Sequence, residues 1–306
     1  MLLYTVRRLL GAIPTLFILA ALTFFLVRLA PGGPFDTDIA WPPEIQQNIN
    51  RVYELDQPVH IQFVHWLRDL SHGDLRESFQ YTGRPVSDVI EDGLPYSLIV
   101  GLLSLFFAVA IGIPLGCLAA IKRGTFWDTS SMFLAVAGIS LPSFLVASIL
   151  ILVFSLQLKW LPPALFEGPE SLVLPVITLG SRPLAVIARL TRSSLLDALN
   201  QDYIRTAYSK GLSVSTVVFK HALKNSVIPV ISVIGPLAAS LVTGSFLVEQ
   251  VFQIPGLGKH FVQSVLNRDY PLVMGLTLTY GILLLLSNVA VDLLYGWADP
   301  RIRLDS

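Results

Sequence analysis

Six long apolar runs constrain this chain more than any other feature of its sequence. They cover residues 9–27, 94–121, 130–156, 172–190, 227–248 and 271–298. Each run is close to or above the roughly 20 residues that a helix needs to cross the hydrocarbon core of a bilayer. Only 14% of the residues are charged and 53% are hydrophobic, whereas soluble domains average roughly 25% charged residues. The sequence therefore predicts an all-α integral membrane protein with six transmembrane helices.

The first apolar run is expected to stay in the mature protein as an anchor. Arg7 and Arg8 precede it, as basic residues would in a cleaved signal peptide. The apolar part of a signal peptide, however, spans about 7 to 15 residues and ends at a small-residue cleavage site. Residues 9–27 exceed that length, and Pro31 directly follows Ala30, where cleavage would have to occur. We therefore expect residues 1–30 to be a cytoplasmic N-terminus followed by the first transmembrane helix.

Residues 31–93, called the cap segment from here on, differ from the apolar runs in composition. They hold 11 acidic residues and only 4 basic ones. Because Lys and Arg are enriched in cytoplasmic loops, this balance places the segment on the outer side of the membrane. Residues 43–55 and 61–70 are expected to be helical. The cap segment is therefore predicted to be a small folded unit on the outer side of the membrane.

Charge counts over the remaining loops predict the orientation of the chain. The proposed cytoplasmic pieces carry 12 of the 21 Lys and Arg residues, against five acidic residues. The inverted topology would place the acid-rich cap segment inside, contrary to the positive-inside rule. The prediction is therefore six spans with both termini cytoplasmic. It includes a transmembrane domain at residues 94–298 and a cytoplasmic tail at residues 299–306.

A mostly polar island at residues 203–224 separates the fourth and fifth apolar runs. The apolar stripe that leads into it has helical spacing and consists of Leu195, Leu196, Leu199, Tyr203 and Ala207. Gly211 is expected to end this helix, because glycine readily adopts the left-handed conformation at a helix C-terminus. Lys210 is favourable against the negative end of the helix dipole. Ser213 is expected to cap a second short helix, whose stripe consists of Val214, Val217, Val218, His221 and Ala222.

The second helix of the polar island is too short to be stable alone. Isolated helices below roughly 12 residues are marginal in water, so it needs a partner surface in the same chain or in another one. One interpretation is an ordinary cytoplasmic loop that folds onto its own helix ends. The other is a docking site for a second protein.

Signatures of enzymes and of nucleotide binding are missing from the sequence. His60 and His65 have no Glu between them, so they do not form the helical zinc pair of an HExxH motif. The GLGK sequence at 256–259 lacks the first glycine of a phosphate loop and is followed by His260. The single cysteine, Cys117, excludes an internal disulfide and a multi-cysteine metal site. We therefore expect no catalytic residue, no metal site, no bound cofactor and no nucleic-acid partner.

Two charged residues, Arg182 and Asp292, fall inside predicted spans. A charge at the centre of a membrane helix costs ~2.5–3.5 kcal/mol on insertion scales. Asn288 lies one turn from Asp292 on the same face, so a hydrated translocation path is one interpretation and structural pairing is the other. Arg182 could snorkel, pair with Asp292, or line the path and attract a carboxylate. An ion-coupled transporter or channel would use such groups, so that class stays open at this point.

The polar island resembles the coupling loop of a known family. The family pattern is Glu-Ala-Ala, three residues, Gly, nine residues, and Ile-x-Leu-Pro. The matching residues here are Arg205, Thr206 and Ala207, then Gly211, then His221, Ala222, Leu223 and Lys224. Arg205 replaces the family's Glu, and Lys224 replaces its Pro. Residues 7–35, 249–258, 266–275 and 299–303 resemble the same family, the permease subunits of bacterial ABC importers of the peptide and nickel branch.

The resemblance implies a type I ABC importer fold, in which one extra N-terminal helix and the cap segment precede a core of five helices. It implies a heterodimer with a homologous second permease and two cytoplasmic ATPases that use ATP and Mg²⁺. It also implies a periplasmic binding protein that delivers the substrate. The implied activity is translocation of oligopeptides across the inner membrane by alternating access, with a dipeptide or nickel as the alternative substrate.

The resemblance also implies a role for the polar island. Residues 191–226 would be the coupling region and would rest on one ATPase. The residues carried over to this role are Tyr203, Arg205, Thr206, Ala207, Lys210, Gly211, His221, Ala222 and Leu223.

Overall fold

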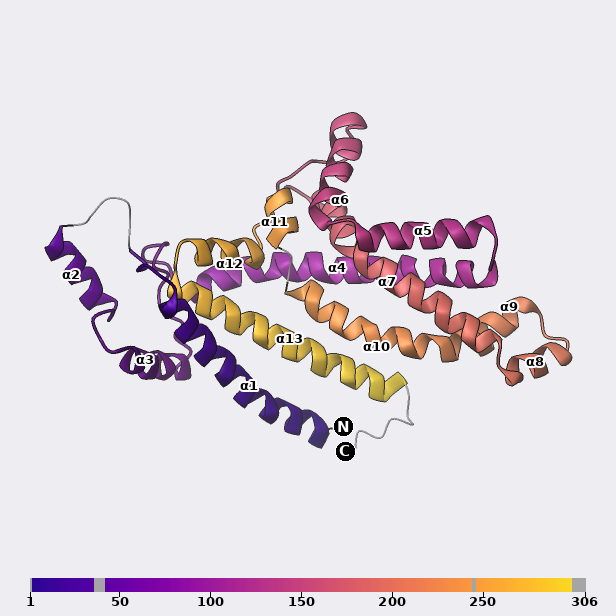
Figure 1. The fold of residues 1–306 in the computed structure, drawn as a ribbon, viewed down its shortest axis with the longest axis horizontal. Coiled ribbons are helices and arrows are strands. Elements are labelled where there is room, and N and C mark those ends of the chain that lie inside the picture. Colours follow the sequence, from indigo (N-terminus) through magenta and orange to yellow (C-terminus); the bar gives the residue numbers. More distant parts are fainter. Residues whose placement is uncertain (1, 36–41, 244–245, 299–306) are drawn as a thin grey trace.

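A computed structural model describes residues 2–35, 42–243 and 246–298. Within these ranges the regular secondary structure is helical, apart from an isolated antiparallel bridge between Glu77 and Pro85, and turns and loops connect the helices. Five long helices lie side by side along the length of the molecule (Figure 1). They are α1 (Leu2–Leu29), α4 (Val86–Ile121), α7 (Val173–Leu199), α10 (Leu223–Val242) and α13 (Tyr270–Ala298). The second helix begins before the predicted residue 94, because α4 extends into the cap segment.

The predicted span at residues 130–156 is broken in the structure. It consists of α5 (Phe126–Ser140) and α6 (Ser143–Leu150), which continues as a π-helix (Ile151–Gln157). The two parts are bent by 113°. Pro142 has no N–H to donate, and its ring disfavours the α conformation of the preceding residue; Leu141 is accordingly extended, at φ −79° and ψ 130°. In the described residues, five helices are long and apolar enough to cross a membrane, and a sixth span exists only if the bent pair counts as one.

The cap segment forms two helices at one end of the bundle, α2 (Pro43–Val52) and α3 (Val59–Ser71). This confirms the helices expected at residues 43–55 and 61–70. Trp66 of α3 packs with Phe24 of α1 and Met274 of α13 in a buried cluster. The guanidinium of Arg28 donates a hydrogen bond to Gln62 Oε1 at 2.9 Å. Helix α3 is therefore fixed to the end of α1, and we call this end of the bundle the cap end.

Asp269 connects the cap segment to the start of α13. Its side chain is fully buried and accepts a hydrogen bond from Leu272 N at 3.2 Å, so it caps the first turn of α13. The same carboxylate accepts hydrogen bonds from the Ser78 hydroxyl, from Phe79 N at 3.1 Å and from Gln80 N at 3.3 Å. One carboxylate therefore holds both the last long helix and the loop that precedes α4.

Residues 249–270, between the fifth and sixth apolar runs, contain most of α11 (Phe246–Phe252) and all of α12 (Leu257–Leu266). Between these helices the chain folds around the buried carboxylate of Glu249. This group accepts hydrogen bonds from Ser97 Oγ at 2.9 Å and Lys259 N at 3.2 Å. Burial raises the pKa of Glu249, and the hydrogen bond from Ser97 opposes that rise. A Cβ at Gly256 would lie 2.5 Å from the carboxylate, so glycine is needed for this close approach.

Candidate functional site

The polar island forms the end of the molecule opposite the cap segment (Figure 1). Its first helix, α8 (Asp202–Ser209), is separate from α7, which ends at Leu199. The single helix expected through residues 195–207 is therefore wrong. Gln201 is extended, at ψ 152°, and this break turns α8 back toward the bundle. As a result Ile204 and Ala207 are buried, whereas Tyr203 is 40% exposed.

Gly211 forms the turn after α8, as the sequence predicts. Its φ is +77°, a conformation that costs an L-residue roughly 1–2 kcal/mol. Its N–H donates to Tyr208 O at 2.9 Å. A Cβ built on Gly211 would meet no atom within 4 Å. The requirement for glycine here therefore comes from the backbone conformation and not from lack of space.

Ser213 caps the second helix of the polar island, which confirms the prediction. Its hydroxyl accepts a hydrogen bond from Thr216 N at 3.4 Å. The expectation of a short, separate second helix is wrong. The helix α9 (Val214–Thr216), a π-helical stretch (Val217–Ala222) and α10 follow one another without a break. The island thus extends directly into a long helix of the bundle.

The inward faces of the island belong to one apolar cluster, which we call the anchor cluster. It contains nine buried residues: Cys117, Ala120, Leu195, Ala198, Ile204, Ala207, Val217, Val218 and Ala222. They come from α4, α7, α8 and the π-helical stretch. Fully burying one Val, Leu or Ile side chain contributes about 1.5–3 kcal/mol. The island is therefore packed firmly onto the ends of α4 and α7 in its own chain.

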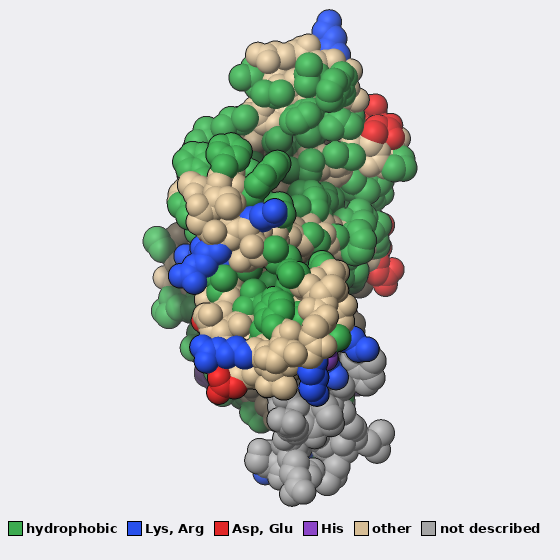
Figure 2. Space-filling model, turned by 90° about the vertical axis from the view of Figure 1, so that its right-hand side faces the viewer, with side chains coloured by type: hydrophobic (Ala, Val, Ile, Leu, Met, Phe, Trp, Pro, Cys, Tyr) green, Lys and Arg blue, Asp and Glu red, His purple; other side chains and the backbone are tan. Residues whose placement is uncertain are grey.

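The outward face of the island combines apolar and basic side chains. Phe219 is 59% exposed, Val214 57%, Tyr208 44% and Leu212 37%. Figure 2 looks onto this end of the molecule and shows Lys and Arg side chains around the exposed hydrophobic groups. The exposed basic residues from this end include Lys122, Arg123, Arg205, Lys210, Lys220 and Lys224. Such a face, apolar at its centre and basic around it, suits contact with another protein.

The residues expected to couple to an ATPase separate into two groups. Tyr203, Arg205, Thr206, Lys210 and Gly211 are exposed, so they are available to a partner. Ala207 and Ala222 are buried in the anchor cluster, and His221 and Leu223 are half-buried. The second group supports the island from within. The sequence-based prediction missed the exposed Tyr208, Leu212 and Phe219, although these large apolar residues lie outside the two predicted stripes. Val214 was predicted to lie on the second stripe, but it is 57% exposed.

An ion pair that the sequence did not reveal connects α5 to α7 near the anchor cluster. Arg192 Nε donates to Asp128 Oδ1 at 2.6 Å, and Arg192 Nη2 donates to Asp128 Oδ2 at 2.8 Å. Asp128 also accepts a hydrogen bond from Gly124 N at 2.9 Å. The side chain of Asp128 is only 8% exposed, and that of Arg192 is 27% exposed. This clamp joins the turn after α4 and the start of α5 to the last third of α7.

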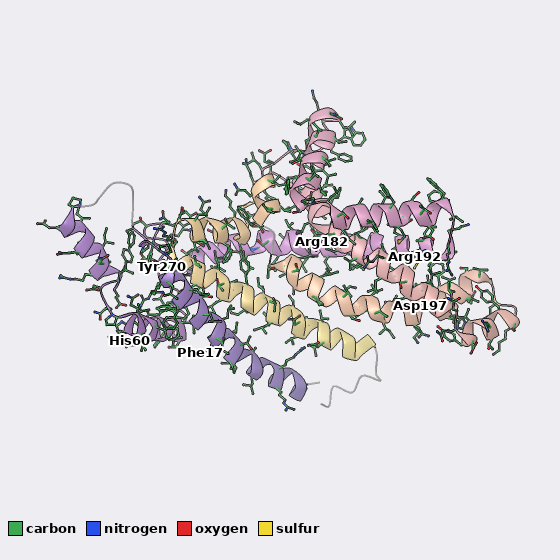
Figure 3. All side chains as sticks on the ribbon, in the orientation of Figure 1. Phe17, His60, Arg182, Arg192, Asp197 and Tyr270 are labelled. Carbon is green, nitrogen blue, oxygen red and sulfur yellow. The ribbon has the colours of Figure 1, made fainter. Side chains whose placement is uncertain are left out.

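A hollow of about 690 Å³ lies where α5 and α6 meet, against α7 and α10. Arg182 of α7, labelled in Figure 3, lines this hollow. Its side chain is exposed. Among the described residues, no carboxylate forms an ion pair with Arg182. Asp292 pairs with Arg8 of α1, so the pairing of Arg182 with Asp292 considered from the sequence is not formed. Asn288 is half-buried on α13, and neither it nor Asp292 lines the hollow.

Comparisons with known proteins agree over nearly the whole chain. The family model described as "Binding-protein-dependent transport system inner membrane component" matches residues 112–304, and its N-terminal companion model matches residues 1–100. The oligopeptide transport system permease protein OppB of Haemophilus influenzae is 43% identical over 305 residues, 99% of this chain and 100% of that protein. The dipeptide transport system permease protein DppB of Bacillus subtilis is 42% identical over 301 residues, 98% of each.

Among solved structures, an inward-facing MetNI methionine ABC transporter chain aligns with a TM-score of 0.56 at 18% identity. The alignment covers 70% of this chain and 97% of that one. At this identity the likeness shows the fold alone. It confirms the predicted type I importer architecture for the bundle.

The clamp between Asp128 and Arg192 gives a stability prediction. Asp128→Asn should lower the thermal unfolding midpoint of the detergent-solubilised protein, because the amide cannot accept both guanidinium hydrogen bonds. A buried ion pair that loses one partner typically costs on the order of 3 kcal/mol. The matched control is Asp197→Asn on α7, where the carboxylate is exposed. Equal midpoints for the two variants would contradict a structural role for the clamp.

Proposed function

The chain belongs to the family of inner-membrane components of binding-protein-dependent transport systems, and on that premise we propose that it translocates oligopeptides as one permease subunit of an ABC importer. The observation that carries the substrate assignment is full-length similarity to permeases named for peptides, at 42–43% identity. A dipeptide remains the second candidate, because the dipeptide permease is almost as similar as the oligopeptide permease. Because the chain belongs to this family, the alternative of an ion-coupled transporter or channel, left open by the sequence, no longer applies.

The proposed assembly contains a homologous second permease, two ATPases and an external binding protein. The family description supports the binding protein, since it names binding-protein-dependent transport. The lack of a phosphate loop in this sequence supports a separate source of ATP hydrolysis. In this proposal the ATPases use ATP and Mg²⁺, while this chain binds no cofactor and catalyses no reaction.

The proposed orientation places the polar island in the cytoplasm and the cap segment outside. The exposed basic residues around the island support this orientation, because positive charge is retained on the cytoplasmic side. Both termini are then cytoplasmic. The island would meet an ATPase through Tyr208, Leu212, Val214 and Phe219, which are exposed apolar residues of the island.

In the proposed mechanism, closure of the ATPases on ATP moves the island. The anchor cluster passes that movement to the inner ends of α4 and α7, since the island is packed onto both helices. Tilting of these helices would open the path outward to receive peptide, and hydrolysis would return it to the inward state. Work is transmitted only if the ATPase binds the island differently in the two states. A rigid island meets that requirement better than a flexible loop.

The substrate class is tested by uptake in a strain that lacks this protein. We expect loss of uptake of labelled pentapeptides and tripeptides, and recovery when the gene is restored. If labelled dipeptides alone lose their uptake, the chain is a dipeptide permease. Normal uptake of all three peptides in a strain without other peptide importers would contradict the proposal.

Gly211 gives a direct test of coupling. Gly211→Val should abolish peptide uptake and peptide-stimulated ATP hydrolysis, because a β-branched residue strains the turn at φ +77°. Gly211→Asn is the matched control, since asparagine tolerates the left-handed conformation, and it should keep most of the activity. Membrane levels of both variants, measured by immunoblot, should equal that of the wild type.

A normal rate of peptide import by the Gly211→Val protein would show that this turn does not position the coupling region. Loss of activity in both variants would mean that any side chain at position 211 blocks a contact with another protein. Backbone strain would then not be the cause.

A further inference from the structure

We propose that the hollow where α5 meets α6 is a substrate subsite, in which Arg182 binds the C-terminal carboxylate of the peptide during its passage. This inference rests on the proposed function and names the part of the substrate that the permease itself recognises.

Arg182 is a permanent cation placed well inside a membrane-spanning helix. It lies within α7, which spans Val173–Leu199, and the guanidinium keeps its proton in proteins. A charged side chain inside a membrane segment normally faces a water-filled cavity or pairs with another group. Among the described residues Arg182 has no carboxylate partner, yet it lines a hollow of about 690 Å³. The hollow is therefore electropositive and open to an anion.

The walls of the hollow favour a small anionic group over a cation. No Asp or Glu lines it in the described part of the chain. Ser140, Ser143 and Ser240 contribute hydroxyl groups, which form no hydrogen bond with another group among the described residues. The hydroxyls of Thr178 and Ser181, by contrast, donate to backbone oxygens of α7 itself. Three hydroxyls therefore remain available to a ligand beside the guanidinium.

The break at Pro142 adds to this electrostatic preference. Helix α6 begins at Ser143, which lines the hollow, and no side chain caps its first turn. The N-terminal end of a helix carries partial positive charge. In transporters, broken helices direct such ends toward anionic groups of the substrate. The start of α6 thus reinforces the positive charge that Arg182 supplies.

A peptide of any sequence carries one invariant anionic group, its C-terminal carboxylate. Guanidinium binds carboxylate through two parallel hydrogen bonds, which gives both affinity and orientation. The volume of the hollow falls within the range of about 300–1,000 Å³ that is usual for sites of small ligands. It suits the end of a peptide and not the whole of a long one. Recognition of the terminus would let one permease pass peptides of varied sequence.

The test compares peptides that differ only at the C-terminus. Initial uptake rates of a labelled neutral tripeptide acid and of its C-terminal amide are measured in proteoliposomes that contain the complete importer with saturating binding protein. The affinity of the binding protein for each peptide is measured separately. Since the binding protein is the same throughout, a change in the acid-to-amide rate ratio between permease variants reports on the permease.

We expect the wild type to prefer the acid by roughly tenfold, the discrimination given by a charged hydrogen-bonded pair. Arg182→Gln should bring the ratio near one by slowing the acid while leaving the amide near its wild-type rate. Arg182→Lys keeps the charge but cannot donate two parallel hydrogen bonds to the carboxylate, so it should give an intermediate acid-to-amide ratio. Arg189→Gln is the matched control, since Arg189 is exposed on the same helix but does not line the hollow; its ratio should equal that of the wild type.

The outcomes separate the two proposals. If the wild-type importer transports neither peptide, the proposed function fails and the subsite fails with it. If it transports both, and Arg182→Gln and Arg182→Lys each leave the acid-to-amide ratio unchanged, only the subsite is overturned. An equal loss of acid and amide uptake in both variants would also overturn it, because Arg182 would then act on the permease fold or on its partner subunit.

Discussion

Apolar packing in the anchor cluster determines how the polar island can act on the helix bundle. It joins residues that lie far apart in the chain, from Cys117 on α4 to Ala222 next to α10. A helix as short as α8 is marginal by itself, so without this packing the polar island would be a flexible loop. With it, two short helical segments and the ends of two long helices form one rigid body. A force applied to the outward face of the island must therefore act on the bundle.

Two rigid elements extend from that body toward the hollow. Helix α7 carries Leu195 in the anchor cluster, Arg192 in the clamp and Arg182 in the hollow. The last two are ten residues apart, about 15 Å along a helix at about 1.5 Å per residue. The clamp fixes the start of α5, and the far end of α5 meets α6 at the hollow. The proposed site of energy input and the proposed substrate subsite are thus connected through one helix and one ion pair.

Much of the fold follows from local sequence, and the exceptions have physical causes. Apolar length predicted the long helices, and the conformational preferences of Gly211 and Ser213 predicted the turn between α8 and α9. The bend at Pro142 was not predicted, because a proline in an apolar run does not by itself show whether the helix breaks. The prolines of α4, α7 and α10 remain inside continuous helices. The sequence also did not predict which charged residues form ion pairs. Asp128 and Arg192 are 64 residues apart, and Asp292 pairs with Arg8 instead of Arg182. The expected tail at residues 299–306 lies outside the described residues.

We propose that the polar island is the surface on which an ATPase acts. Photo-cross-linking in membranes that contain the complete importer tests it most directly. A benzophenone amino acid replaces Tyr208, which is 44% exposed on the island, or Val64, which is 62% exposed on α3 at the cap end. We expect an adduct with the ATPase from position 208, with a yield that changes when ATP binds, and none from position 64. Absence of an ATPase adduct at position 208, or its formation from position 64, would contradict the claim.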